Sequence, residues 1–447
     1  MDKHITSLEI TDICYGTYGT GKYENKLIYV KDTVPGDIVS VRIKRKRKGI
    51  HYASVTEMLK KSELRAQSDC PHFPECGGCL FRDITYENQL ILKNRLLLNE
   101  LKHQDIYAEP EAIIPSPTTL YYRNKMEFTF GTKDGSIILG MHKKGDFSTV
   151  INTPECRLQS TKSSRIREII IGWANKNNLI SYNPRTHEGT LRHLLIREGK
   201  NTGQIIIALI TAHENLPDLE LLSEILKKEI TELVGFSLVI NSNIADTVTY
   251  EQQITITGQN YFLEKLDERH YEVSLSSFFQ TNSKGTEVLY RHLKDIVNTI
   301  PTETVLDLYC GAGSIGIYIA DLKKEIIGVE LHAQSILNAE INKTLNNLTN
   351  ISYHHKDVRL FLKEFNYDKE NTLAIIDPPR EGLHPKTRKM LLEHALPWLI
   401  YVSCNPKTLA IDLKYLQEGY TISCLQPFDL FPYTPHQESI ALLIKKV

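Results

Sequence analysis

A glycine-rich turn between a predicted strand and a predicted helix places the strongest constraint on how this chain folds. The apolar run 305–308 leads into glycines at positions 311, 313 and 316, and the apolar segment 315–322 follows. Such a turn lets the backbone approach a nucleotide, and Glu330, which ends the next predicted strand, can bond both ribose hydroxyls. The motif fits an NAD site, an S-adenosylmethionine (SAM) site or a tight turn that binds nothing.

Two further predicted strands end in polar residues. Residues 372–376 lead into Asp377-Pro-Pro-Arg, and residues 398–402 lead into Ser403-Cys404-Asn-Pro. Ligands of open α/β sheets bind outside the carboxyl ends of the strands, so we expect the glycine turn, Glu330, Asp357, Asp377 and Cys404 to meet in one crevice. A methyltransferase that acts on a pyrimidine carbon needs a cysteine held in this way, whereas hydride transfer has no obvious use for one.

Composition and length indicate a globular protein of several domains. The 447 residues carry a formal net charge of −1 and are 41% hydrophobic, which suggests about three domains; we place them at 1–60, 61–275 and 276–447. The first residues lack the apolar core of a signal peptide, and no apolar run is long enough to span a membrane. We therefore expect a cytoplasmic monomer, whose eight cysteines are ligands, a nucleophile or buried side chains.

Residues 1–60 predict a small β-barrel. Short strands at 7–11, 26–30, 37–43 and 51–56 are separated by turn residues. The third strand runs into a cluster of cations beside Tyr52: Arg42, Lys44, Arg45, Lys46, Arg47 and Lys48. Charge runs are usually solvated, but a basic edge with aromatics on a small barrel favours RNA binding.

Four cysteines have the spacing of a metal centre. Cys70, Cys76 and Cys79 follow a C-x5-C-x2-C pattern with two glycines, and Cys156 is a remote fourth candidate. Three close cysteines and one distant one favour a [4Fe–4S] cluster over zinc, with unliganded cysteines as the remaining alternative. We expect the centre to be structural and to tie Cys156 to the earlier segment.

The middle and end of the chain alternate between predicted helices and strands. We expect helices at 86–102, 163–175, 219–228 and 284–298, and strands at 121–130, 191–197, 204–210 and 439–444. His436 and Glu438 face the same side if their segment is extended. Five basic residues are either RNA contacts or ordinary surface charge: Arg123, Lys125, Arg192, His193 and Arg197.

Taken together and in order, these motifs resemble those of the RNA 5-methyluridine methyltransferases. The barrel and cysteines are joined by Phe278-Phe-Gln-Thr-Asn, Asp307-Leu-Tyr-Cys-Gly-Ala-Gly, Asp377-Pro-Pro-Arg, Ser403-Cys-Asn-Pro and His436-Gln-Glu. The resemblance implies an α/β, Rossmann-like class I SAM-dependent methyltransferase domain. It also implies an OB-like N-terminal barrel (a TRAM module) and a mixed α+β central domain with an iron–sulfur cluster. The 23S rRNA branch carries the cluster and often the barrel, whereas the bacterial tRNA branch generally lacks both, which favours 23S rRNA over tRNA.

The resemblance also implies a role for each motif. Uracil C5 is too poor a nucleophile to attack a methylsulfonium, so a thiolate, here Cys404, first adds at C6, and Glu438 later removes the C5 proton. Asp377 bonds the uracil edge and contacts SAM, and Phe278 packs on the extruded base. The remaining positions that match SAM contacts are Gln280, Tyr309 and Glu330, while Ser314 departs from some relatives. The cluster ligands are Cys70, Cys76, Cys79 and Cys156.

Three other functions compete with this one. An amino-methylating enzyme needs no covalent nucleophile, which Cys404 argues against. An NAD-dependent dehydrogenase leaves the barrel and the cysteine cluster unused. A non-catalytic RNA-binding protein is the rival from a different class, and the pair of Cys404 and Glu438 weighs against it.

Overall fold

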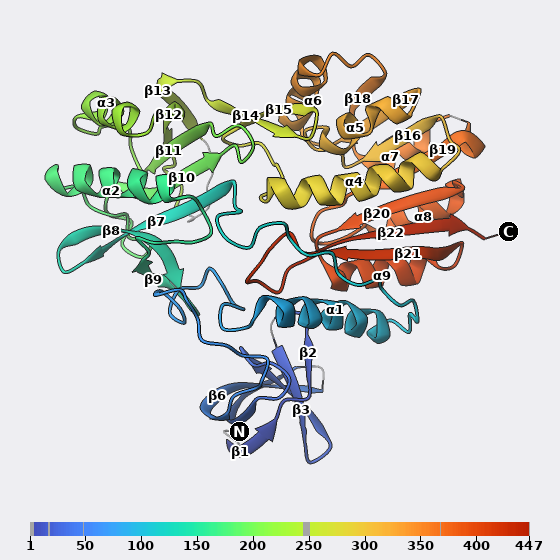
Figure 1. Cartoon of the computed structure of the whole chain (residues 1–447), viewed down its shortest axis with the longest axis horizontal. Coiled ribbons are helices and arrows are strands. Elements are labelled where there is room, and N and C mark those ends of the chain that lie inside the picture. The colour runs from blue at the N-terminus through green and yellow to red at the C-terminus, as the bar shows by residue number, and fades with distance from the viewer. Residues whose placement is uncertain (1–3, 17, 48, 245–250, 367, 447) are drawn as a thin grey trace.

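The computed structural model describes residues 4–16, 18–47, 49–244, 251–366 and 368–446, which form three sheets and a hairpin (Figure 1). Among these residues no helix is long and apolar enough to cross a membrane.

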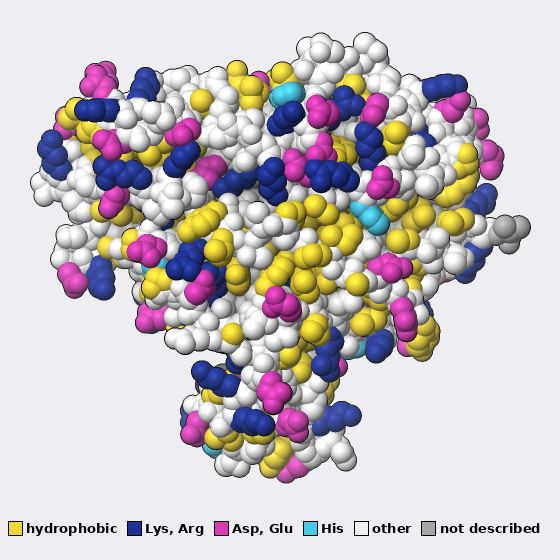
Figure 2. Space-filling view, in the orientation of Figure 1, with side chains coloured by type: hydrophobic (Ala, Val, Ile, Leu, Met, Phe, Trp, Pro, Cys, Tyr) yellow, Lys and Arg dark blue, Asp and Glu magenta, His cyan; other side chains and the backbone are white. Residues whose placement is uncertain are grey.

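The N-terminal sheet has six strands in the order β1-β5-β6-β4-β3-β2. They are β1 His4–Glu9, β2 Asp12–Cys14, β3 Tyr18–Tyr23, β4 Lys26–Lys31, β5 Ile38–Arg47 and β6 Ile50–Lys60. Strand β1 pairs with β5 and β2 pairs with β3, and residues 10 and 11 alone separate β1 from β2. The two ends of the sheet therefore meet in one bent stretch of chain, around a core that includes Ile5, Val30 and Val41. This lobe stands apart from the rest of the molecule in Figure 2.

The middle sheet has seven strands in the order β13-β12-β11-β10-β7-β8-β9. They are β7 Lys125–Lys133, β8 Ser136–Lys143, β9 Asp146–Asn152, β10 Leu191–Glu198, β11 Ile205–Thr211, β12 Leu233–Ile240 and β13 Gln252–Gly258. One face packs against α2 Thr161–Lys176 and α3 Leu219–Glu229. The other contributes to a core shared with the hairpin β14 Tyr261–Leu266 and β15 Arg269–Ser274 and with the C-terminal sheet.

The C-terminal sheet is doubly wound, with the order β18-β17-β16-β19-β20-β22-β21. Its strands are β16 Thr304–Leu308, β17 Glu325–Glu330, β18 Ile351–His355, β19 Thr372–Ile376, β20 Trp398–Ser403, β21 Tyr420–Phe428 and β22 Glu438–Lys445. The core on one face of this sheet contains residues of α4 Ser283–Thr299 and α5 Ser314–Tyr318, and α6 Ala333–Leu345 lies next to α5. The core on the opposite face contains residues of α7 Val358–Glu364, α8 Pro385–His394 and α9 Pro406–Leu416. Helices on both faces explain why the parallel strands are almost wholly apolar. The order reverses between β16 and β19, where such sheets open a ligand crevice.

Helix α1, Tyr86–His103, lies against the C-terminal sheet although it precedes the middle sheet in the chain (Figure 1). It packs on α9, and Leu97 and Leu101 belong to the core beneath that helix. Lys93 Nζ of α1 lies 2.5 Å from Asp429 Oδ1, and both side chains are fully buried. Helix α1 therefore fixes the loop 429–437 that joins β21 to β22.

Two predicted elements differ from the structure. The α-helix expected over 315–322 ends at Tyr318, and a separate 3-10 turn follows at Ala320–Leu322. Gly316 and the three isoleucines of this segment have weak helix propensity, which accounts for the early end. The strand expected from residue 121 begins at Lys125, since Tyr121 has a φ of 55° and Arg123 N–H donates to the Leu158 carbonyl.

Three of the five basic residues expected as possible RNA contacts are buried. Arg192, His193 and Arg197 are 2%, 3% and 0% exposed. Arg192 donates to the Asn241 and Asn243 carbonyls, and Arg197 to those of Ser274 and Ser277. These side chains lie in the interior of the middle sheet, so neither alternative, an RNA contact or an ordinary surface charge, describes them.

Candidate active site

Three polar side chains come together at one edge of the C-terminal sheet. Asp377 directly follows β19, Cys404 directly follows β20, and Glu438 is the first residue of β22. Strand β22 runs antiparallel to β20 and pairs Ser439 with Ser403. The beginning of β22 therefore lies beside the ends of β19 and β20, and the charges of Asp377 and Glu438 act on the Cys404 thiol.

The electrostatics of this edge raise the pKa of all three of its acids. Burial, followed by the charges of Glu438 and Asp377, raises the pKa of the Cys404 thiol to about 12. Burial, with Asp377, raises the pKa of Glu438 well above its usual range, and burial, with Asp307, raises that of Asp377 to about 7. Groups with such shifted pKa values in a crevice are characteristic of catalytic sites.

Glu438 also lacks a partner for one of its oxygens. The residue is 2% exposed, and among the described residues nothing hydrogen-bonds to Oε2. Buried polar atoms in native proteins are almost always hydrogen-bonded. We therefore expect a bound ligand to complete this site.

The segment around Cys404 is fixed by its neighbour Asn405. The Asn405 side chain caps α9 by accepting from the Lys407 N–H, and its amide donates to the Arg380 carbonyl at 2.8 Å. Pro406 occupies the first turn of α9, where its missing N–H costs nothing. The Ser-Cys-Asn-Pro sequence thus holds the cysteine at a rigid junction between a strand and a helix.

Arg380 is a functional candidate that the sequence analysis did not single out. Its Nη2 donates to His436 Nδ1 at 3.2 Å. Burial, helped by this cation, lowers the pKa of His436 to about 4, so the imidazole is neutral and accepts. The Arg380 charge opposes the rise in the pKa of both Cys404 and Glu438. Its place directly after Asp377-Pro-Pro was the available signal.

The glycine turn offers a cradle for a nucleotide. Gly311 has a φ of 53°, and an added Cβ would meet no atom within 4 Å. Glu330 accepts from the Gly311 N–H at 3.2 Å and from the His332 N–H at 2.8 Å, which orients its carboxylate toward the turn. Asp307 accepts from the Gly316 N–H, while its Oδ1 is buried and unpartnered among the described residues. The open space and the carboxylates fit the ribose of SAM.

The other predicted residues lie in different environments. Tyr309 directly precedes it with a φ of 66°. Gln280 is buried just before α4, whereas Phe278 is 69% exposed. Asp357 was expected in the crevice. Its carboxylate instead caps the N-terminus of α7 and forms an ion pair with Arg359 at 2.6 Å.

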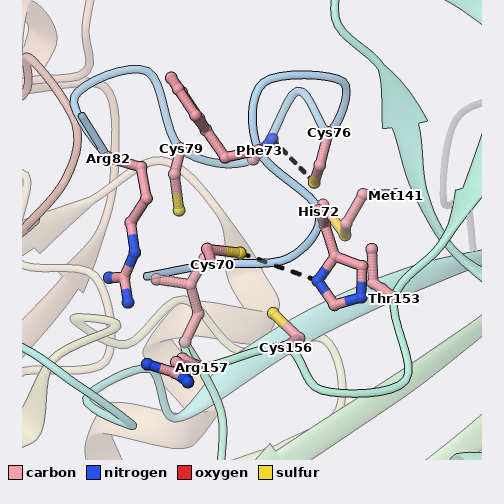
Figure 3. A pocket seen from close by; sticks show the side chains of 12 residues that line it. Cys70, His72, Phe73, Cys76, Cys79, Arg82, Met141, Thr153, Cys156 and Arg157 are labelled. Carbon is pink, nitrogen blue, oxygen red and sulfur yellow. Dashed lines mark hydrogen bonds between the residues drawn. The ribbon is translucent and has the colours of Figure 1, made fainter. Parts of the chain in front are cut away.

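The four predicted cysteine ligands line a single cavity. Figure 3 shows Cys70, Cys76, Cys79 and Cys156 with their sulfur atoms facing a common space. Burial and the neighbouring cysteines raise the pKa of Cys79 to about 12, whereas the charge of Arg82 opposes that rise. Within the part of the chain that the structure describes, no group of three or more His, Cys, Asp or Glu side chains could hold a metal ion.

Comparisons with known proteins decide the family. Residues 85–446 match the family described as tRNA (Uracil-5-)-methyltransferase. The chain belongs to this family. It is 38% identical to an uncharacterized RNA methyltransferase of Clostridium acetobutylicum, over 98% of this chain and 97% of the relative. It is 34% identical to one of Caldanaerobacter subterraneus subsp. tengcongensis, over 99% of each.

A solved structure extends the likeness to three dimensions. The chain superposes with a TM-score of 0.78 and 27% identity on the Pyrococcus abyssi tRNA (uracil-54, C5)-methyltransferase in complex with S-adenosyl-L-homocysteine. The match covers 99% of this chain and 100% of that one. The predicted family and the α/β class I methyltransferase fold are therefore confirmed, and the family acts on C5 of uracil in RNA.

Proposed function

We propose that this protein transfers a methyl group from SAM to C5 of a specific uridine in 23S rRNA, through a covalent adduct with Cys404. The observation that carries the proposal is the meeting of Cys404, Glu438 and Asp377 at one sheet edge, where the two carboxylates affect the pKa of the thiol. An amino-methylating enzyme would not need the thiol, and a non-catalytic binder would need neither thiol nor base.

The proposed reaction begins with the Cys404 sulfur forming a bond to C6 of the uracil. The thiol pKa of about 12 means that attack requires loss of the thiol proton, and the nearby Asp377, with a pKa of about 7, offers a carboxylate that can accept it. Glu438 thereby stays available as the base of the later step. The C5–C6 double-bond electrons move onto the ring carbonyl, which leaves C5 nucleophilic. Bound SAM supplies the methyl group that C5 takes.

Glu438 then completes the reaction. Its carboxylate removes the C5 proton, the electrons of that C–H bond re-form the C5–C6 double bond, and the Cys404 sulfur leaves. Asp377 is proposed to hold the uracil edge and to contact SAM, and the exposed ring of Phe278 to pack on the extruded base. Gln280, Tyr309 and Glu330 are proposed to hold SAM.

The choice of RNA rests on the resemblance to the 23S rRNA branch. A tRNA substrate is the second candidate, because the Pyrococcus abyssi tRNA enzyme matches this chain over 99% of its length. Mapping 5-methyluridine in 23S rRNA and tRNA from a deletion strain tests both. Loss of a single 23S rRNA site supports the proposal, loss from tRNA alone replaces it with the second candidate, and unchanged 5-methyluridine in both contradicts it.

The cysteine cavity is proposed to hold a [4Fe–4S] cluster that ties Cys156 to the segment 70–79. The support is the four sulfur atoms around one space and the flanking Arg82 and Arg157, whose charges suit thiolates. The spacing of three close cysteines and one distant one favours the cluster over zinc, which more often uses two C-x2-C pairs. The cluster would add a cross-link to the fold, and no step of the methyl transfer is assigned to it.

Anaerobically purified protein is expected to be brown and to contain about four irons and four sulfides per chain. Cys156→Ser should lose most of this iron, whereas Cys424→Ser, in β21, should keep it. Elemental analysis and the visible absorption spectrum provide the measurement. Stoichiometric zinc without iron would contradict the cluster.

The N-terminal sheet is proposed to be an OB-like barrel of the TRAM type that binds RNA. Arg42, Lys44, Arg45, Lys46 and Arg47 are exposed on β5, and Lys48 lies outside the described residues. Arg45 lies over the ring of Tyr52 at 4.8 Å, and Tyr52 packs edge-on against Tyr18 and Tyr29. Cations beside aromatic rings are the usual means of holding single-stranded RNA.

Replacing Arg45, Lys46 and Arg47 with alanine in one variant is expected to weaken RNA binding and to make it less dependent on salt. Each lost phosphate contact on a single strand lowers the slope of log affinity against log salt by about 0.7, so three should lower it by about 2. Fluorescence anisotropy over a range of KCl concentrations measures the slope. If affinity and slope are unchanged, the basic strand is only a solvated edge.

A further inference from the structure

A cavity of about 390 Å³ lies beside Phe278 and is not used by any step above. Its walls come from the start of β7, from the segment 277–281 and from Gly78 in the cysteine loop. Gly78 lines the cysteine cavity as well, so the two cavities share a wall. The volume lies within the roughly 300–1,000 Å³ of small-ligand sites.

The charges on one wall of this cavity fit a single phosphodiester. Lys125 and Glu127 alternate on β7 and therefore project to one side, and Arg123, just before the strand, lines the same cavity. Within the described residues neither cation forms an ion pair, and Arg123 Nε donates only to the Lys125 carbonyl at 3.3 Å. Two cations and one carboxylate leave one net positive charge, which matches the single negative charge of a phosphate linkage.

Lys125 is held in a strained electrostatic position. Burial, with the charges of Arg197 and Arg123 nearby, lowers the pKa of its ammonium group. An anion placed between Arg123 and Lys125 would relieve this repulsion. The carboxylate of Glu127 opposes part of this shift. Since the two cations and Glu127 still leave one net positive charge on this wall, the cavity is suited to an anion from outside.

The cavity adjoins the proposed uracil site at Phe278. This ring is 69% exposed and is one of the residues that line the cavity. The Thr281 hydroxyl, also on the lining, has no hydrogen-bond partner among the described residues. An RNA strand that passes from the uracil site over Phe278 therefore enters a space with an unused hydroxyl and two unpaired cations.

We propose that this cavity binds the nucleotide next to the target uridine, with the linking phosphate held between Arg123 and Lys125. The proposal rests on the proposed function, because it takes Phe278 as the contact with the extruded base. It assigns the cavity to the same RNA strand and not to a separate small molecule.

The test compares Lys125→Met with Lys133→Met, which makes the same substitution at an exposed position of the same strand. Methionine keeps the apolar stem and removes the charge. Binding of a short fluorescent oligouridylate, followed by anisotropy at several salt concentrations, requires no catalysis. Lys125→Met is expected to bind roughly tenfold or more weakly, the effect of losing one hydrogen bond to a charged group, with a salt slope lower by about 0.7. Lys133→Met should match the unmodified protein.

A second probe locates the contact on the RNA backbone. In an oligouridylate with neutral methylphosphonate linkages, the difference between Lys125→Met and Lys133→Met should disappear. Equal binding by the two variants on the charged RNA, or a difference that persists on the neutral RNA, would overturn the proposal. Methylation assays on the same variants separate this proposal from the proposed function. If RNA is methylated while Lys125→Met binds normally, the assignment of the cavity fails and the proposed methyltransferase function stands.

Discussion

Cys404→Ala is expected to bind both RNA and SAM and to transfer no methyl group. Without the sulfur at C6, uracil C5 stays too weak a nucleophile to attack a sulfonium methyl carbon, so activity should fall to background. Incorporation of labelled methyl into RNA measures this, and equilibrium binding of each ligand shows that the site is intact.

Cys424→Ala is the matched control, because Cys424 is a partly buried free cysteine in β21 and does not line the crevice. It should retain full activity. Methyl transfer by Cys404→Ala at a rate near that of the control would show that the nucleophile has been assigned wrongly.

Glu438→Gln is expected to pass the first two steps and to stall before elimination. Glutamine has almost the same shape but cannot take the C5 proton, so release should slow by about 10²–10⁴-fold, the effect of a positioned base. The stalled species is methylated RNA joined covalently to protein. It should appear on a denaturing gel as a band that requires both SAM and Cys404.

Two controls accompany this variant. Glu418→Gln changes an exposed glutamate just after the end of α9 and should turn over normally. The double variant Cys404→Ala/Glu438→Gln should form no adduct. Normal turnover by Glu438→Gln, or an adduct in the double variant, would contradict the division of labour between the two residues.

The raised pKa of Glu438 also predicts how the rate of elimination depends on pH. The carboxylate is the active form, and burial with Asp377 nearby moves its pKa upward. Elimination by the unmodified protein should therefore accelerate as pH rises through that elevated pKa. The same dependence should be absent from Glu438→Gln.

The sequence predicted the parts of the site that local pattern determines. The apolar strands before Asp377 and Cys404 are β19 and β20, because a strand covered on both faces is apolar throughout and its polar tip stands out. The glycine turn was recognisable for a similar reason. Its geometry requires glycine where φ is positive, as at Gly311 and Gly313.

Other parts depend on contacts that no local pattern encodes. The insertion of β22 between β20 and β21, which brings Glu438 to Cys404, follows from packing of the whole sheet. The contact of Arg380 with His436 joins residues 56 positions apart. Arg192 and Arg197 seemed to be surface cations, but backbone carbonyls of later segments accept from them in the interior.

The ion pair of Lys93 with Asp429 has a consequence for the order in which the chain folds. The two residues are 336 positions apart, so the contact closes one of the longest loops in the molecule. Such long-range contacts form late, since the entropy of the chain must be lost before they stabilise anything. Both charges remain in water until then, and burying one without the other would be strongly unfavourable. The loop before Glu438 is therefore expected to dock late in folding.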